Sequence, residues 1–182
     1  MSEPPRTPHR WLDPRRSGLQ GAPPRLREWL CHSGSLSHRL ERCPGPFRVR
    51  LLRQGLVRPS REEARFLALR NGQWAWVRES LLEVGGNPWV FARSVIPVRS
   101  RQGPLRRLPR LGHQPLGELL FGDGGSRQSL EVCRLRPGDP LLQGMPDPPP
   151  QPVWCRRSGF RRHGCRLLVL EAFLPGFGGA VR

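Results

Sequence analysis

Apolar and polar residues alternate most clearly between Trp74 and Pro97, a pattern typical of two antiparallel strands joined by a tight turn. Gly85-Gly-Asn-Pro supplies the tolerance for positive φ and the break in pairing that a hairpin turn needs. Strand geometry sends successive side chains to opposite faces. One face of the first strand is predicted to carry Trp74, Trp76, Arg78, Ser80 and Leu82, and the other Ala75, Val77, Glu79 and Leu81.

Arg78 is the unusual member of the first face, because a guanidinium lies there in line with two indoles. Two interpretations are open. The side chain extends along the tryptophans to water, as most isolated strand arginines do. Alternatively, it points into a pocket and binds an anion.

The rest of the chain predicts short helices and further strands. Pro24 suits a first helical turn, and apolar residues then recur at helical spacing over 26–30 and 36–40. A half-exposed strand is expected from Phe47 to near Gly55, and Arg61–Ala68 is interpreted as a connection. Later elements are a short helix at 115–121 and strands at 129–136, 154–162 and 166–175. Pro115 leaves the first amides of its helix, including that of Leu116, free for a carboxylate.

The predicted organisation is one domain over residues 25–176, which is long enough to bury a substantial core. Residues 1–24 are rich in Arg and Pro and hold few large apolar groups, so we expect a disordered tail. Residues 137–152 contain a Pro-Pro-Pro run and are interpreted as an exposed loop insertion. Residues 177–182 are expected to be a flexible C-terminus.

Glu171 is the second unusual residue, because apolar side chains flank it on both faces of the last predicted strand. A buried carboxyl is therefore expected. Burial without a partner would favour the neutral form and suit general acid or base chemistry. A structural ion pair with one of the many arginines explains the same position equally well.

The positive charge of the chain favours anionic partners but does not identify which anion binds. The chain has 31 basic residues, all of them arginine, and a formal net charge of +17. Such a field attracts nucleic acid, acidic lipid or small polycarboxylates. The arginines are scattered, which looks more like compositional bias than adaptation to a partner. No run interleaves basic and aromatic residues as RNA-binding sheets do, so nucleic acid is not expected as a partner.

Several chemistries are disfavoured by the sequence. The five cysteines form no Cys-x-x-Cys pair and no leader sequence is evident, so a reduced cytoplasmic setting is expected. No histidine and cysteine cluster has the spacing of a structural zinc site, and a metal is not expected. The absence of lysine excludes Schiff-base chemistry. The longest apolar run, 167–174, is too short to cross a bilayer, though the charge could allow peripheral contact with an anionic membrane.

With Arg78 and Glu171 singled out, the order of motifs from about Leu26 to Pro175 resembles the chorismate lyase family. The resemblance rests on the shared order and spacing of several motifs, none of which is decisive alone. They are Ser35-Leu-Ser-His-Arg-Leu-Glu, Arg53-Gln-Gly-Leu-Val, Trp76-Val-Arg-Glu-Ser-Leu-Leu, Asn87-Pro-Trp, Arg93-Ser-Val-Ile-Pro-Val, Gln114-Pro-Leu-Gly-Glu-Leu-Leu-Phe, Trp154-Cys-Arg-Arg-Ser and Leu170-Glu-Ala-Phe-Leu-Pro.

The resemblance implies an α+β fold, a single antiparallel sheet of about six strands with helices packed on it and a ligand buried under two flaps. It implies conversion of chorismate to 4-hydroxybenzoate and pyruvate in the ubiquinone pathway, without a cofactor. The carboxylate-binding arginine of the family falls on Arg78 and its active-site glutamate on Glu171. Two main-chain contacts to the ligand fall on Leu36 and Leu116, and Leu36 stands where the family usually has methionine.

Three alternatives remain open from the sequence. An enzyme that makes a different benzoate from chorismate would share Arg78. A domain of the same general fold binds small anions without chemistry in some bacterial regulators, and a basic nucleic-acid-binding protein would share the charge. The family resembled is usually monomeric, so a monomer is expected.

Overall fold

The computed structural model describes residues 9–16, 19–70, 72–100, 110–122, 125–162 and 164–178. Its helices are α1 (Pro24–Leu30), α2 (Leu36–Leu40), α3 (Arg61–Phe66) and α4 (Gly117–Phe121), with short 3-10 turns η1 (Val98–Ser100) and η3 (Pro140–Leu142). Its strands are β1 (Phe47–Val57), β2 (Ala75–Val84), β3 (Asn87–Pro97), β4 (Gly125–Leu135), β5 (Val153–Arg162) and β6 (Cys165–Phe173).

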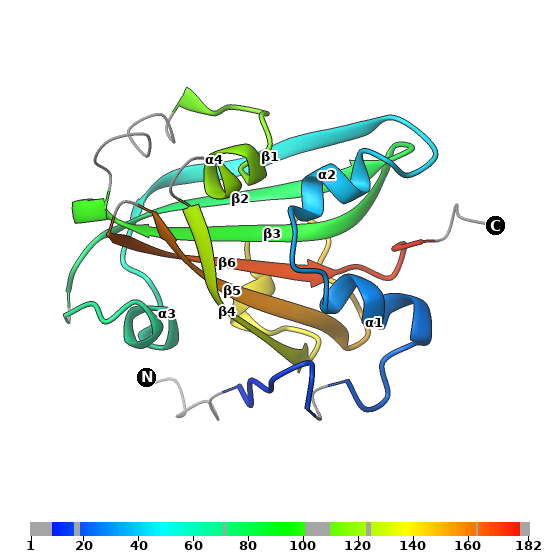
Figure 1. The fold of residues 1–182 in the computed structure, drawn as a ribbon, viewed down its shortest axis with the longest axis horizontal. Helices are drawn as coiled ribbons and strands as arrows, with labels where there is room; N and C mark the ends of the chain where they lie inside the picture. Colours follow the sequence, from blue (N-terminus) through cyan, green and yellow to red (C-terminus); the bar gives the residue numbers. More distant parts are fainter. Residues whose placement is uncertain are drawn as a thin grey trace.

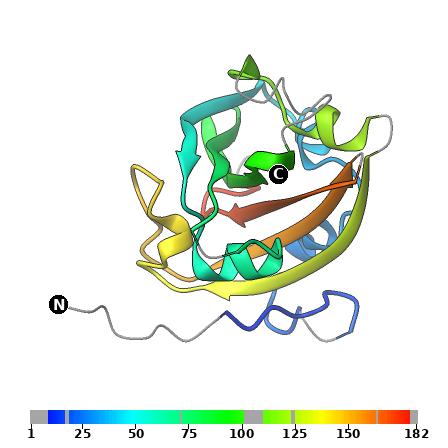
Figure 2. The ribbon, with the colours of Figure 1, turned by 90° about the vertical axis from the view of Figure 1, so that its left-hand side faces the viewer.

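The strands form one antiparallel sheet in the order β1-β2-β3-β6-β5-β4, which confirms the predicted α+β architecture. Figure 1 shows α2 and α4 in front of the strands, and Figure 2 shows that the sheet is strongly curved. None of the described helices is long and apolar enough to cross a membrane.

Apolar side chains bury both faces of the sheet. On the face covered by α1, α2 and α4, residues such as Leu30, Leu36 and Leu120 pack with inward residues of the strands. On the other face, Leu67 and Leu142 pack with a second set of strand residues. The buried residues of each strand therefore divide between the two faces according to the alternation of side chains.

The central hairpin forms as predicted. β2 pairs with β3, and Val84 lies opposite Asn87. Gly85 and Gly86 form the two-residue turn with φ of +59° and +81°, values that favour glycine and that match the twist of the strands. The pairing shifts by one residue between Leu82 and Glu83, so the turn does not set the register as far as Arg78. Alternation along β2 still places Arg78 with Ser80 and Leu82 on the face covered by α2 and α4.

Residues 61–68 are more ordered than the expected connection. Ser60 begins helix α3, its hydroxyl accepts from the Glu63 amide, and the Glu63 carboxylate accepts from the Ser60 amide at 2.9 Å. This reciprocal capping box satisfies two backbone donors and stabilises a helix of only six residues. The Ser-x-x-Glu spacing was its sequence signal.

The N-terminal segment from residue 9 packs on the domain, unlike the disordered tail expected from composition. The Leu12 amide and carbonyl pair with Val132 of β4 at 2.9 and 2.8 Å. The His9 ring contacts Glu62 at 2.6 Å and Asp139 at 2.7 Å. These two ion pairs and the backbone bridge offset the conformational entropy that the segment loses on ordering. Its few apolar side chains alone would not offset that loss. Residues 1–8 and 179–182 lie outside the described residues.

The Pro-rich segment 137–152 is a loop, as expected, but it is not exposed throughout. Leu142 in η3 is 1 % exposed and belongs to the core on the face away from α2 and α4. A Cβ added to Gly144 would lie 2.0 Å from the Glu79 carboxylate, so the loop backbone lies directly on the sheet. The segment covers that face of the sheet.

Candidate active site

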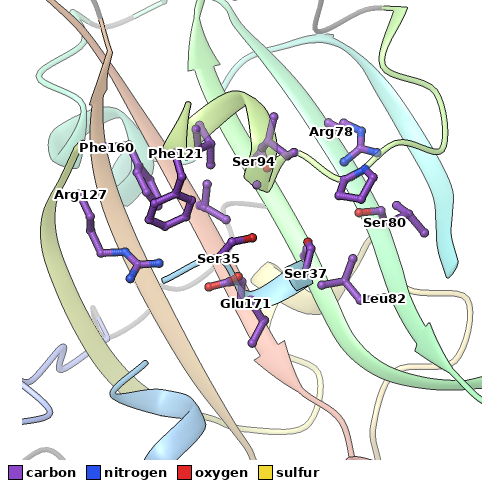
Figure 3. Close-up of a pocket in the computed structure, with 18 residues that line it drawn as sticks. Ser35, Ser37, Arg78, Ser80, Leu82, Ser94, Phe121, Arg127, Phe160 and Glu171 are labelled. Carbon is purple, nitrogen blue, oxygen red and sulfur yellow. The ribbon is translucent and has the colours of Figure 1, made fainter. Parts of the chain in front are cut away.

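A cavity lies between the sheet and the first turns of α2 and α4, and Figure 3 shows its lining side chains. All four residues assigned to the site from sequence line it: Leu36, Arg78, Leu116 and Glu171. The structure thus brings together residues from α2, β2, the start of α4 and β6. Its other polar lining residues are Ser35, Ser37, Ser80, Ser94 and Arg127.

Arg78 is buried in this cavity, with 3 % of its surface exposed. Its Nη2 donates to the carbonyls of Gly112 and Gln114, both at 3.0 Å, while Nε has no acceptor among the described residues. No described carboxylate pairs with it, and burial lowers its pKa to about 10. Arg78 therefore stays cationic at neutral pH with its charge uncompensated, and the interpretation that it extends to water is wrong.

The Arg78 hydrogen bonds also hold the loop that leads into α4. Gly112 and Gln114 lie just before Leu116, which is the N-cap of α4 and makes no side-chain cap. No described residue accepts a hydrogen bond from the Leu116 amide. A cation and a free backbone donor thus lie at the same end of the cavity, which suits a carboxylate.

The starts of α2 and α4 approach each other closely at Gly117. A Cβ added there would lie 2.2 Å from Ser35 Oγ, the atom that caps α2 by accepting from the His38 amide at 3.4 Å. A larger side chain would either displace the Ser35 hydroxyl from its capping position or shift one helix. The two helices therefore close the cavity together.

Glu171 is 7 % exposed and lies on β6, directly opposite Arg156 of β5. Arg156 Nε donates to Glu171 Oε2 at 2.5 Å, so the expected ion-pair interpretation is confirmed. Oε1 makes no hydrogen bond within the described part of the chain. One carboxylate oxygen is thus fixed by the ion pair, and the other remains for a ligand in the cavity.

Arg156 is a site residue that sequence reasoning missed. It is fully buried, and its Nη1 donates to the carbonyls of Trp29 at 2.8 Å and His32 at 3.1 Å. Arg156 and Arg157 are adjacent in the sequence, and only strand register shows which of them faces Glu171. Alternate residues of β5 face opposite sides of the sheet. The residue at which β5 begins, after the Pro-rich loop, therefore decides which arginine faces Glu171.

Arg127 of β4 is a second missed residue. Its guanidinium lies over the rings of Phe121 at 5.1 Å and Phe160 at 5.0 Å. Burial and the nearby Arg156 lower its pKa to about 10, so it is also a cation at neutral pH. The cavity therefore holds more positive than negative charge.

The opposite face of the sheet carries a buried ion network that is compensated. Arg93 Nε donates to Glu63 Oε1 at 2.6 Å, and both Arg93 and Arg53 bond to Glu79. Glu79 is 1 % exposed and Glu63 2 %. Because each of these charges has a partner, this network is structural. By contrast, Arg78 and Arg127, for which no carboxylate partner is described, line the cavity on the other face.

Comparison with known sequences gives a consistent result. The sequence model of a family described as chorismate lyase matches residues 8–178. A probable chorismate pyruvate-lyase of Halorhodospira halophila is 46 % identical over 156 residues, covering 84 % of this chain and 82 % of the relative. A probable chorismate pyruvate-lyase of an Azoarcus species is 43 % identical over 164 residues, covering 85 % and 86 %.

Solved structures with a similar fold include ligand-binding domains of transcriptional regulators. PhnF from Mycobacterium smegmatis matches with a TM-score of 0.60 at 12 % identity, covering 80 % of this chain and 65 % of that one. The ligand-binding domain of a GntR-family regulator from Bordetella bronchiseptica matches with a TM-score of 0.53 at 18 % identity, covering 75 % and 89 %. At such low identity these matches show the shared fold alone.

Proposed function

The chain belongs to the chorismate lyase family and is a lyase, and we propose that its cavity is where chorismate loses pyruvate to give 4-hydroxybenzoate. The single observation that supports this site most strongly is the buried, uncompensated Arg78 opposite the ion-paired Glu171. An aromatic acid with a hydroxyl opposite its carboxylate would present its carboxylate to Arg78 and its hydroxyl to Glu171.

The reaction requires little covalent help from the protein. The ether bond between ring carbon 3 and the side-chain oxygen breaks, a proton leaves ring carbon 4, and the ring becomes aromatic. The enolpyruvate that departs takes up one proton and becomes pyruvate, so atoms and charge balance. Aromatisation supplies the driving force, and the enzyme contributes orientation, anion binding and proton transfer.

Arg78 would bind the ring carboxylate. Its Nε–H is buried and has no acceptor among the described residues, and the Leu116 amide lies at the same end of the cavity. A charge-assisted hydrogen bond in a site shielded from water is stronger than the same bond in solvent. This end of the cavity would therefore set the orientation of the ring.

Glu171 would act on the opposite end of the ring. Glu171 Oε2 accepts a hydrogen bond from the Arg156 guanidinium at 2.5 Å, the arrangement of a carboxylate in an ion pair, and a carboxylate accepts a proton but cannot donate one. The first proton transfer is therefore from substrate to Glu171, which then returns the proton to enolpyruvate. The Leu36 amide, at the start of α2, is the proposed main-chain contact to the ring oxygen.

The proposal includes the family's place in ubiquinone biosynthesis, where 4-hydroxybenzoate is a precursor. A monomeric state and a cytoplasmic location stay predictions, and the five free cysteines are compatible with a reducing compartment.

The test is to incubate purified protein with chorismate and quantify 4-hydroxybenzoate and pyruvate by chromatography. Equal amounts of the two products are expected. Glu171→Gln should lower kcat by about 100-fold or more, because the amide cannot accept the proton. Glu83→Gln is the matched control, since Glu83 pairs with Arg50 at 2.7 Å outside the cavity.

The same assay separates the lyase from an anion-binding domain without chemistry. If chorismate binds but remains intact, the fold is serving as a sensor and the proposed reaction is wrong. Normal turnover by Glu171→Gln would instead contradict only the proton-transfer role.

A further inference from the structure

Arg127 lies in the cavity without a role in the steps described above. Figure 3 shows Arg127 and Arg78 on opposite sides of the cavity, with Glu171 between them. The two arginines come from β4 and β2, which are separated in the sheet by β3, β6 and β5. The cavity thus has a cation at each end.

The charges of the site exceed what one carboxylate would balance. Arg78, Arg127 and Arg156 are cationic, and Glu171 is the only carboxylate among the described lining residues and their ion-pair partners. His32 adds no charge at neutral pH, because burial and nearby arginines lower its pKa. These side chains carry a net charge of +2, which would balance the two negative charges of chorismate. The product 4-hydroxybenzoate carries only one negative charge and would leave one positive charge unbalanced.

The hydrogen bonds of Arg127 leave donors for a ligand. Its Nη1 donates to the carbonyls of His32 at 3.0 Å and Ser33 at 2.5 Å, and Nη2 to that of Gly34 at 3.4 Å. Nε is buried and has no acceptor among the described residues. A guanidinium has five N–H donors, and these bonds use three of them. Nε–H and one N–H of Nη2 remain and can donate to a carboxylate.

Neighbouring groups hold the guanidinium in place. Phe121 and Phe160 lie against it and restrict the orientation of its plane. The carbonyls of residues 32–34 lie just before Ser35, the N-cap of α2. Arg127 is therefore fixed before a ligand arrives, which lowers the entropic cost of binding one.

The shape of chorismate connects these observations. Its hydroxyl carbon lies across the ring from the carbon that bears the ring carboxylate, and the enolpyruvyl ether is on the carbon next to the hydroxyl. With the ring carboxylate on Arg78 and the hydroxyl on Glu171, the side chain projects from the Glu171 end of the cavity. We propose, resting on the function proposed above, that Arg127 binds the enolpyruvyl carboxylate and so distinguishes substrate from product.

The experiment compares substrate and product on the same variants. Arg127→Met keeps much of the packing and removes the donors, and Arg134→Met on the same strand is the control, because Arg134 is exposed and lies outside the cavity. Measurements are kcat/KM for chorismate and Kd for 4-hydroxybenzoate by calorimetric titration. Arg127→Met should lower kcat/KM about 10- to 150-fold, the loss of one charge-assisted hydrogen bond. Its Kd for 4-hydroxybenzoate should stay within about threefold of wild type, since the product lacks that carboxylate.

Arg127→Lys should recover part of kcat/KM, because the charge remains. A parallel loss of substrate turnover and product affinity would show that Arg127 only holds the 32–34 loop, and unchanged kcat/KM would show that it does not bind substrate; either result overturns the inference. If wild-type protein yields no product from chorismate, the proposed function itself fails, which is a different outcome from an active enzyme that is indifferent to Arg127.

Discussion

Replacing Arg78 by methionine should reduce catalysis while leaving the fold at least as stable as before. Arg78 is a buried guanidinium without a carboxylate partner, whose only described hydrogen bonds go to two carbonyls. A charge held in this way costs stability and is retained for what it binds. The two effects of the substitution can be measured separately.

The magnitude follows from the burial of Arg78. Its pKa falls from 12.5 to about 10, which corresponds to about 3 kcal/mol of destabilisation of the charged side chain. Loss of the hydrogen bonds to Gly112 and Gln114 offsets about 1 to 3 kcal/mol of the gain. The free energy of unfolding should therefore stay constant or rise by up to about 2 kcal/mol. Transition-state binding should weaken by about 2 to 4 kcal/mol, a fall of about 30- to 1,000-fold in kcat/KM.

The assay pairs urea unfolding with turnover of chorismate, and Arg93→Met is the comparison. Arg93 lies on the neighbouring strand and pairs with Glu63 and Glu79. Its loss leaves the buried Glu63 carboxylate without an ion-pair partner and Glu79 with Arg53 alone, which should cost about 3 to 5 kcal/mol. The reasoning about Arg78 is refuted if Arg78→Met keeps kcat/KM, or if it destabilises the protein as much as Arg93→Met does.

Three further predictions concern the Arg156 ion pair, the contact between α2 and α4, and the docking of the N-terminal segment. Arg156→Met should lower stability by about 3 to 5 kcal/mol in urea unfolding, because Glu171 loses its partner, and adding Glu171→Gln should recover part of the loss; a variant as stable as wild type would contradict the ion pair. Gly117→Ala should raise KM severalfold by separating α2 from α4, whereas Gly55→Ala, whose Cβ meets no atom within 4 Å, should leave KM unchanged; equal effects would show that the close contact is unimportant. Hydrogen bonds to Asp139 and Glu62 raise the pKa of His9 to about 10, so its contribution to docking residues 9–16 is complete below about pH 6.5 and is lost as the pH rises through about 10. Limited proteolysis should therefore cut this segment faster at high pH, and a rate independent of pH in that window would contradict the ion pairs.

The positions of Arg78 and Glu171 could be predicted because strands alternate with a period of two residues. Arg78 shares a face with Ser80 and Leu82 because side chains alternate along β2, although the pairing set by the Gly85-Gly86 turn shifts by one residue between Leu82 and Glu83. Glu171 stood out because its neighbours are apolar on both sides. In both cases the signal is local.

Arg127 and Arg156 could not be selected from sequence, because they are two of 31 arginines and nothing local distinguishes them. Their roles arise from cross-strand partners and from carbonyls of the loop at residues 32–34. Similarly, the docking of His9 depends on Glu62 and Asp139, which lie 53 and 130 residues away. Such contacts follow from tertiary structure and not from propensity.

A crystal structure of the protein with 4-hydroxybenzoate would test the proposed site directly. The carboxylate should contact Arg78 and the Leu116 amide, the hydroxyl should contact Glu171 Oε1, and Arg127 should contact neither end of the product. A reversed ring with its carboxylate on Arg127, or a product bound outside the cavity beneath α2 and α4, would contradict the proposed site.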